Sequence, residues 1–183
     1  MLYILGGAPR SGKTTLSRRI LREKLIPYFP IDSLVGALKE GAGSPYVNHE
    51  VPFIPKAENL WPLTKHLFAY FIWNEDAYLV EGDPILPKQV KELEDDGKKV
   101  RACFLGFTKI SPLEKLQMLR KYGKGKKDWT NDIADDPLTY VLGKMIEFSQ
   151  YLEKECAKFG YKYIDVSDDF LGGHDEAFKY LTS

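Results

Sequence analysis

The chain has 183 residues and a formal net charge of zero, so no overall electrostatic attraction draws it to nucleic acid or to an anionic membrane. Hydrophobic residues make up 44% of it, enough for a sizeable core. No apolar run reaches the roughly 18–20 residues of a membrane span, and glycine and charge arrive too early for a signal peptide. Cys103 and Cys156 lie in apolar patterns without C-x-x-C spacing, which predicts buried free thiols. We expect a single cytoplasmic domain over residues 1–183. The oligomeric state stays open.

Strand and helix patterns alternate along the chain. Strands are predicted at residues 2–5, 26–32, 77–82, 100–107 and 161–167. Helices are predicted at residues 14–24, 57–74, 86–97, 111–122 and 136–159, with one or two helical turns at 33–39 and a short helix at the C-terminus. The Gly/Pro-rich stretch 41–56 has no clear periodicity. Continuous apolar strands that alternate with helices favour an α/β fold with a parallel sheet covered on both faces.

The most specific motif follows the first strand. Residues 7–14 read Gly-Ala-Pro-Arg-Ser-Gly-Lys-Thr and fit G-x-x-x-x-G-K-[ST], the phosphate-binding loop. Glycine allows the backbone N–H groups to turn inward around phosphate, and the following helix adds its positive N-terminal end. Lys13 can reach the β- and γ-phosphates, and the Thr14 hydroxyl can bind Mg²⁺. The predicted nucleoside triphosphate site comprises Gly7, Ala8, Pro9, Arg10, Ser11, Gly12, Lys13, Thr14 and Thr15.

With this motif between a strand and a helix, the chain resembles the P-loop kinases of small molecules, which include nucleotide, shikimate and gluconate kinases and chloramphenicol phosphotransferase. The resemblance covers the whole chain in element order. It implies a three-layer α/β sandwich with a five-stranded parallel sheet, an ATP site with Mg²⁺, and a helical lid. It also implies a substrate-binding insertion at residues 40–60 and a lid at residues 120–136.

Asp32 stands where the second predicted strand ends, and ligands of open α/β sheets gather at such strand ends. The segment Asp32-Ser33-Leu34 resembles the Asp-Ser-Leu of chloramphenicol phosphotransferase. In this family an Asp at this place holds or deprotonates the acceptor hydroxyl, which makes Asp32 a catalytic candidate. The alternative is an N-cap for the following helix.

Glu81 ends the third predicted strand and resembles the acidic residue of the Asp-Gly-Phe-Pro-Arg turn of nucleoside monophosphate kinases. The resemblance gives it a role in orienting Mg²⁺ through water beside Thr14. Ile85 replaces the family's arginine that grips the acceptor phosphate, and this departure disfavours a monophosphate acceptor. Asp83 is either a second functional carboxylate or an exposed turn residue.

Two further segments are candidates for the acceptor and for the lid. The first, residues 41–61, mixes aromatic and hydrogen-bonding side chains, as small-molecule pockets do: Tyr46, Asn48, His49, Glu50, Phe53 and Trp61. The second carries five cations between two helices: Arg120, Lys121, Lys124, Lys126 and Lys127. In the family such lid cations stabilise the transferring phosphate, and Arg120 is the preferred one, with Arg10 as its competitor. The alternative is a solvated basic loop.

These features favour an ATP-dependent kinase that transfers phosphate to a hydroxyl of a small molecule, with Lys13, Asp32 and Arg120 as its catalytic residues. Thr14 and Glu81, the latter through water, are the expected magnesium-binding residues. A nucleoside or nucleoside monophosphate kinase is the second candidate. A non-catalytic nucleotide-binding module is the third. The identity of the acceptor and the preference for ATP over GTP are not encoded in a recognisable motif.

Overall fold

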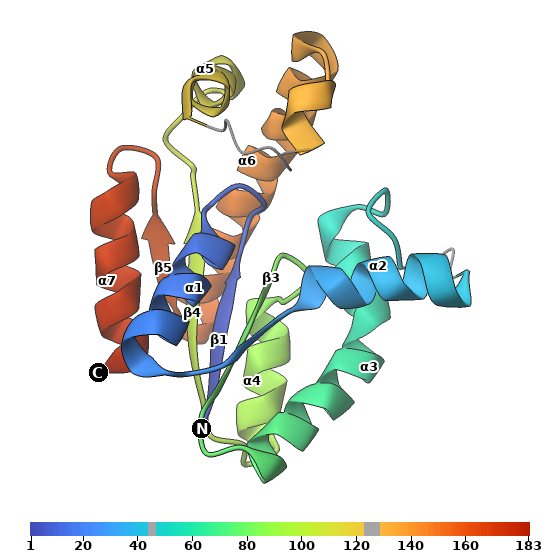
Figure 1. Cartoon of the computed structure of the whole chain (residues 1–183), viewed down its shortest axis with the longest axis vertical. Coiled ribbons are helices and arrows are strands. Elements are labelled where there is room, and N and C mark those ends of the chain that lie inside the picture. The colour runs from blue at the N-terminus through green and yellow to red at the C-terminus, as the bar shows by residue number, and fades with distance from the viewer. Residues whose placement is uncertain (44–46, 123–128) are drawn as a thin grey trace.

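A computed structural model describes residues 1–43, 47–122 and 129–183, and its centre is a five-stranded sheet (Figure 1). The strands are β1 (Leu2–Gly7), β2 (Tyr28–Pro30), β3 (Tyr78–Gly82), β4 (Val100–Gly106) and β5 (Lys162–Asp165). They pair in the order β2-β3-β1-β4-β5, and every pair is parallel. The predicted five-stranded parallel α/β fold is therefore confirmed.

The register of the sheet brings the predicted functional residues together at one edge. β1 lies between β3 and β4, and its residue Gly6 pairs with Gly82 on one side and with Phe104 on the other. The carboxyl ends of β1 and β3 therefore lie side by side. The phosphate loop that follows β1 and Glu81 near the end of β3 meet at this edge, where α/β proteins bind their ligands.

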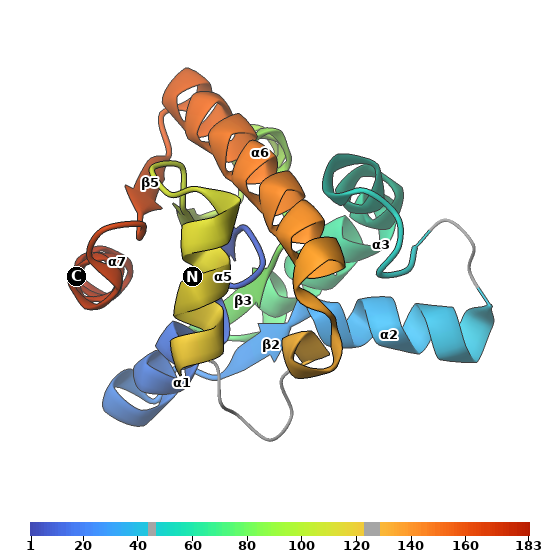
Figure 2. The same cartoon turned by 90° about the horizontal axis from the view of Figure 1, so that it is seen from above.

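Helices cover both faces of the sheet. They are α1 (Lys13–Lys24), α2 (Ile31–Ala42), α3 (Phe53–Asn74), α4 (Pro87–Asp95), α5 (Pro112–Tyr122), α6 (Asp135–Phe159) and α7 (Phe170–Thr182), with a 3₁₀ turn η1 (Trp129–Asp132) before α6. The view from above shows α1 and α7 on one face and α3, α4 and α6 on the other (Figure 2). Among the described helices, none combines the length and the apolar character needed to cross a bilayer.

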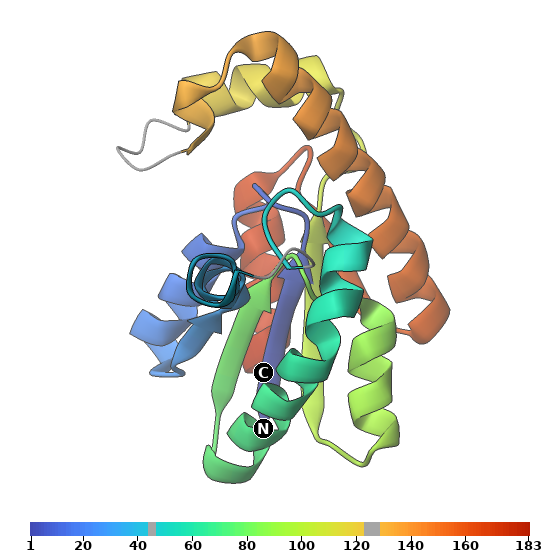
Figure 3. The same cartoon turned by 90° about the vertical axis from the view of Figure 1, so that its right-hand side faces the viewer.

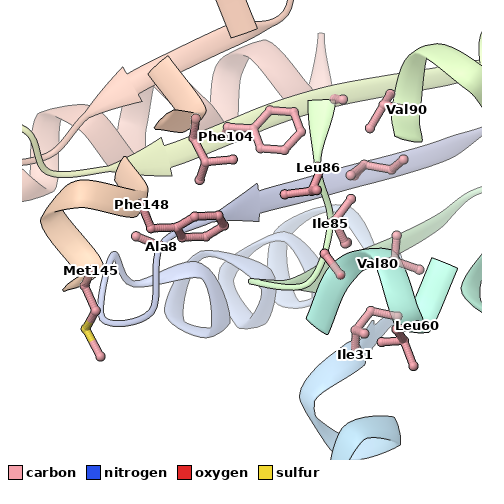
Figure 4. Close-up of a cluster of buried hydrophobic side chains, with 14 of the residues drawn as sticks. Ala8, Ile31, Leu60, Val80, Ile85, Leu86, Val90, Phe104, Met145 and Phe148 are labelled. Atoms are coloured by element: carbon pink, nitrogen blue, oxygen red, sulfur yellow. The ribbon is translucent and has the colours of Figure 1, made fainter. Parts of the chain in front are cut away.

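The two faces of the sheet give two hydrophobic cores. The larger core lies under α3, α4 and α6, where Ala8 and Ile85 pack with Phe104 and Phe148 (Figure 4). The smaller core lies under α1 and α7 and includes Leu16 and Ile164. Ala8, which follows β1 directly, is fully buried, so the start of the phosphate loop is part of the core.

Above the carboxyl edge of the sheet, α5, η1 and the first turns of α6 pass over the phosphate loop (Figure 3). We call this the roof. The sequence predicts the start of α5 correctly, with Pro112 at its first position. The Ser111 hydroxyl accepts a hydrogen bond from Glu114 N at 3.2 Å, and Glu114 Oε2 accepts one from Ser111 N at 2.8 Å. This reciprocal capping fixes the first turn of α5.

The region between β2 and α3 differs most from expectation. β2 has only three residues, because Pro30 has no N–H to donate and the strand lies at the sheet edge. α2 runs for 12 residues instead of one or two turns, and α3 begins at Phe53 instead of Ala57. Only the two ends of the stretch expected to be irregular, residues 41–42 and 53–56, are therefore helical, while residues 43 and 47–52 are not. Within 41–56, residues 44–46 lie outside the described part.

Candidate active site

The phosphate loop has the backbone that its glycines predict. Gly7 has a φ of +138° and Gly12 a φ of +89°, values that favour glycine. A Cβ on Gly7 would lie 2.1 Å from Leu105 O, and one on Gly12 would lie 2.4 Å from the His174 ring. Arg10 also has a positive φ, 65°. The loop therefore turns sharply against β4 and α7, with no room for side chains at its two glycines.

Hydrogen bonds hold this loop from several directions. Ala8 N donates to Leu105 O at 2.9 Å, and the buried Lys13 Nζ donates to Ala8 O at 2.9 Å. His174 Nε2 lies 3.0 Å from Ser11 O, and because a carbonyl only accepts, this ring nitrogen is the donor. The loop is thus tied to the sheet and to α7, and its lysine is folded back onto it.

Thr14 and Glu81 meet where β1 and β3 end. Thr14 Oγ1 donates to Glu81 Oε1 at 2.8 Å. Burial raises the pKa of the Glu81 carboxyl, although Lys13 and the Thr14 hydrogen bond oppose the shift. Hydroxyl and carboxylate oxygens are the donors that Mg²⁺ prefers, and these two come from the motif residue and from the strand end that the sequence indicated. The pair fits a magnesium ion bound together with a triphosphate.

Asp32 adjoins a buried ion pair on the acceptor side, while its own side chain is exposed toward the cavity. It lies in the first turn of α2 and not at a strand end, and because Pro30 precedes the helix as its cap, the N-cap interpretation of Asp32 is wrong. Asp83 is 5% exposed and pairs with Lys56 Nζ at 2.7 Å, so Asp83 is not an exposed turn residue. The Asp32 carboxyl shares a hydrogen bond with Asp83.

The pKa values of these two carboxyl groups diverge. Burial, followed by the neighbouring Asp83, raises the pKa of Asp32 to about 8, although its side chain still opens toward the cavity. Burial also acts to raise the pKa of Asp83, but Lys56, Asp32 and Lys13 together outweigh it, and the pKa of Asp83 is lowered. Asp83 thus carries the negative charge beside Lys56, and Asp32 is the group poised to gain or lose a proton near neutral pH.

One cavity of about 820 Å³ connects Asp32 with Glu81 and the phosphate loop, and its size suits a small-molecule ligand. Its polar lining comes from Arg10, Lys13, Thr14, Thr15, Asp32, Glu81 and Lys115. Apolar and aromatic side chains complete it: Pro9, Met118, Leu119, Tyr122, Trp129, Phe170 and Leu171, together with Gly12. The floor of the cavity, residues 7–15 with Glu81, and the roof face each other across it. Phosphate-loop residues, Asp32 and Glu81 are therefore brought together as the sequence indicated.

Arg120 takes a different place from the one its predicted role requires. Its guanidinium donates to Asp135 Oδ1 at 2.8 and 3.0 Å, to Thr130 O at 2.7 Å and to Ile133 O at 2.6 Å. These bonds tie the end of α5 to η1 and α6. A catalytic role would require Arg120 to leave Asp135. Lys121 is exposed, and Lys124, Lys126 and Lys127 lie outside the described residues.

The described residues of the segment predicted to bind the acceptor, residues 41–61, do not line this cavity. Phe53 stacks on Phe148 at 4.8 Å between ring centroids, and Trp61 Nε1 donates to Glu92 at 2.7 Å. Asn48 accepts backbone hydrogen bonds within its own turn, and His49 is exposed, as is Glu50. Tyr46 lies outside the described residues. The aromatic walls of the cavity come instead from the roof and from the start of α7.

Three side chains at the site were not singled out from the sequence. Lys56 lies on the same helix face as Leu60, Lys115 on the same face as Leu119, and His174 near Ala177. In each case a titratable residue occupies the buried face of an amphipathic helix, which is the signal that could have found it. Ile85, where the family has an arginine, is buried in the larger core.

No protein-family model matches the chain, and no curated protein sequence matches it. Solved structures do match its fold. A shikimate kinase from Bacteroides thetaiotaomicron aligns over 100% of this chain and 99% of its own, with a TM-score of 0.60 and 16% identity. A gluconokinase from Sinorhizobium meliloti 1021 aligns over 98% and 90%, with a TM-score of 0.59 and 16% identity. An uncharacterized protein from Eubacterium ventriosum ATCC 27560 has a TM-score of 0.53 and 13% identity over 99% and 97%.

At these identities the likeness shows the fold, and it confirms the predicted resemblance to P-loop small-molecule kinases at that level.

Proposed function

We propose that this protein is a kinase that transfers the γ-phosphate of ATP to a hydroxyl group of a small molecule. The observation that carries the proposal is that Asp32 opens into the same cavity as Lys13, Thr14 and Glu81. A phosphate-binding loop alone would suit any nucleotide-binding module. A carboxyl group that can exchange a proton, in the same cavity as that loop, suits transfer to an alcohol.

Each residue has a proposed role in this reaction. The backbone of residues 7–15 and the Lys13 ammonium bind the triphosphate, and Lys13 exchanges Ala8 O for phosphate oxygens. Thr14 and Glu81, the latter through water, hold a magnesium ion, which when bound would neutralise charge on the phosphates. Asp32 in its ionised form accepts the proton of the acceptor hydroxyl as that oxygen attacks the γ-phosphorus, and ADP leaves. Arg120, once released from Asp135, is the proposed transition-state cation.

The two neighbours with named activities act, by their names, on gluconate and shikimate, but their low identity to this chain carries no acceptor over. Among nucleotide acceptors, monophosphates are disfavoured, because Ile85 is packed in the core where their kinases place a phosphate-binding arginine. We therefore expect an acceptor that presents a hydroxyl and not a phosphate to the end of the cavity near Asp32.

The decisive experiment is a transfer screen with γ-labelled ATP and Mg²⁺ against sugars and sugar acids, polyols, amino alcohols, nucleosides, nucleoside monophosphates and hydroxylated antibiotics. We expect one hydroxyl compound to become labelled with wild-type protein. Lys13→Ala is the matched inactive variant, with ATP affinity lower by about 10²–10³-fold, because a buried charged partner of the phosphates is lost.

Binding of Mg·ATP by calorimetry separates the remaining candidates. A protein that binds ATP but labels no acceptor in the screen would favour the nucleotide-binding module. Efficient labelling of a nucleoside monophosphate would favour the second candidate. Equal ATP affinity in wild type and Lys13→Ala would remove the phosphate-site assignment itself.

A further inference from the structure

Lys115 is a buried cation at the boundary between roof and floor. It lies in the first turns of α5, is 5% exposed and lines the cavity together with Lys13. Its Nζ donates to Arg10 O of the phosphate loop at 3.3 Å and lies 3.9 Å from the centroid of the Phe107 ring. The amine is thus held next to the phosphate loop by a carbonyl and an aromatic face, two partners that do not neutralise it.

In the ligand-free protein, the surroundings of Lys115 disfavour its charged form. Burial, followed by the nearby Arg10, lowers the pKa of Lys115 to about 8, and Asp165 opposes them only in part. Within residues 1–43, 47–122 and 129–183, Lys115 has no carboxylate ion-pair partner. Leucine or methionine would fill the same space at less cost. A lysine here is therefore explained by an anion that arrives from outside the chain.

The position of the amine is well defined. The capping hydrogen bonds between Ser111 and Glu114 fix the first turn of α5, and Lys115 N donates to Ser111 O at 3.0 Å. With Arg10 and Lys13, Lys115 gives the cavity lining three cations against two carboxylates, Asp32 and Glu81. This excess of positive charge lies where the loop would hold a polyphosphate.

We propose that Lys115 is an additional phosphate-binding residue of the nucleotide site, which α5 supplies to the triphosphate next to Arg10 and Lys13. The inference rests on the proposed nucleotide site. It assigns ground-state binding of the triphosphate to a residue of the roof that differs from Arg120. On nucleotide binding the Lys115 ammonium exchanges its bond to Arg10 O, wholly or in part, for phosphate oxygens.

The test measures binding of inorganic tripolyphosphate and of Mg·ATP by calorimetry, which needs no acceptor. Lys115→Met keeps the stem of the side chain and removes the charge, and Lys115→Arg restores a cation. We expect Lys115→Met to weaken both ligands by about 10–100-fold and Lys115→Arg to recover most of that loss. Lys109→Met, at an exposed lysine six residues earlier, is the matched control and should leave both affinities unchanged.

A second measurement uses the wild-type protein, so it stands even if the methionine variant does not fold. An amine-acylating reagent at pH 8 should modify Lys115, and tripolyphosphate should suppress this at Lys115 but not at Lys109, as read by mass spectrometry of peptides.

Wild-type binding that Lys115→Met leaves intact, or equal modification with and without tripolyphosphate, would overturn the assignment of Lys115 alone. Absence of any binding to wild-type protein would overturn the proposed nucleotide site and this assignment together.

Discussion

The floor and the roof of the cavity both carry cations, yet their ion-pairing differs. On the floor, Lys13 is 6% exposed and folds back on Ala8 O, and its loop is braced by His174 and by β4. In the roof, Arg120 is about one-third exposed and its charge is matched by Asp135 of α6. Lys13 is therefore ready for an anion, whereas Arg120 is already paired with one.

This difference shows that a cation can lie near the cavity without being available to bind a ligand. Lys115 and Arg120 lie on one helix, five residues apart, but only Lys115 lines the cavity. Arg120 secures the end of that helix to η1 and α6. The floor is thus organised for binding before any ligand arrives, and a part of the roof must rearrange if Arg120 is to take part in chemistry.

The largest effect is expected at the acceptor end of the cavity, near Asp32. Asp32→Asn removes the group proposed to accept the hydroxyl proton but keeps its shape. It should lower the transfer rate by about 10²–10⁴-fold, the usual contribution of acid–base help, with ATP affinity unchanged. Steady-state kinetics with the identified acceptor and ATP calorimetry measure the two parts. A normal rate would leave Asp32 without a catalytic role.

The roof is probed by comparing the two partners of one ion pair. Arg120→Ala and Asp135→Ala both break the ion pair, and its loss should cost about 1 kcal/mol of unfolding free energy, since the pair is partly exposed. Only Arg120→Ala removes the proposed transition-state cation, and it should lower turnover by about 10²-fold more than Asp135→Ala does. Equal turnover in the two variants would make Arg120 a purely structural residue.

The rigidity of the floor is tested at Gly12. A Cβ there would lie 2.4 Å from the His174 ring on a backbone with φ of +89°, so Gly12→Ala should weaken ATP binding about 10-fold and lower unfolding free energy by about 1–3 kcal/mol. Gly36→Ala, on α2 with nothing within 4 Å of the new atom, is the matched control and should be neutral or slightly stabilising. If the two variants behaved alike, the loop would not be packed against α7 as described.

The smallest effect concerns the pH dependence of stability. The pKa of Asp32 is about 8 in the folded chain and near 4 in an unfolded one, so the folded state holds this proton more tightly. The contribution of Asp32 to the free energy of unfolding is thus fully present below about pH 4 and is lost as the pH rises to about 8.

Melting temperatures in nucleotide-free buffer without magnesium should show wild type losing about 2 °C relative to Asp32→Asn across that range, after allowing for solvent in the cavity. Asp168→Asn, at an exposed position, controls for general charge effects. A difference between wild type and Asp32→Asn that stayed constant with pH would contradict the raised pKa of Asp32.

The sequence allowed the floor to be predicted almost entirely, because eight consecutive residues fix both its backbone and its chemistry. The five strands and the start of α5 were predictable for the same reason: apolar runs and capping residues are local signals. The length of α2 was not, because Gly36 and Gly41 lower the helix propensity that tertiary packing of Val35 then overrides.

The pairing of Lys56 with Asp83 and the contact of Lys115 with Arg10 were also beyond local signals. The first joins residues 27 positions apart in the sequence, and the second joins residues 105 positions apart. Only the folded chain shows which lysine on an amphipathic helix faces the cavity. The same holds for Arg120, whose partner Asp135 was visible in the sequence but whose orientation toward that partner was not.

The contact between His174 and Ser11 has a consequence for how the protein is made. During synthesis the phosphate-loop residues emerge long before the helix that carries His174. β1 likewise gains its two neighbouring strands only after residues 78–82 and 100–106 have been added. We therefore expect nascent chains that lack α7 to bind ATP weakly, so that the capacity to bind nucleotide appears only after residues 170–182 have been added.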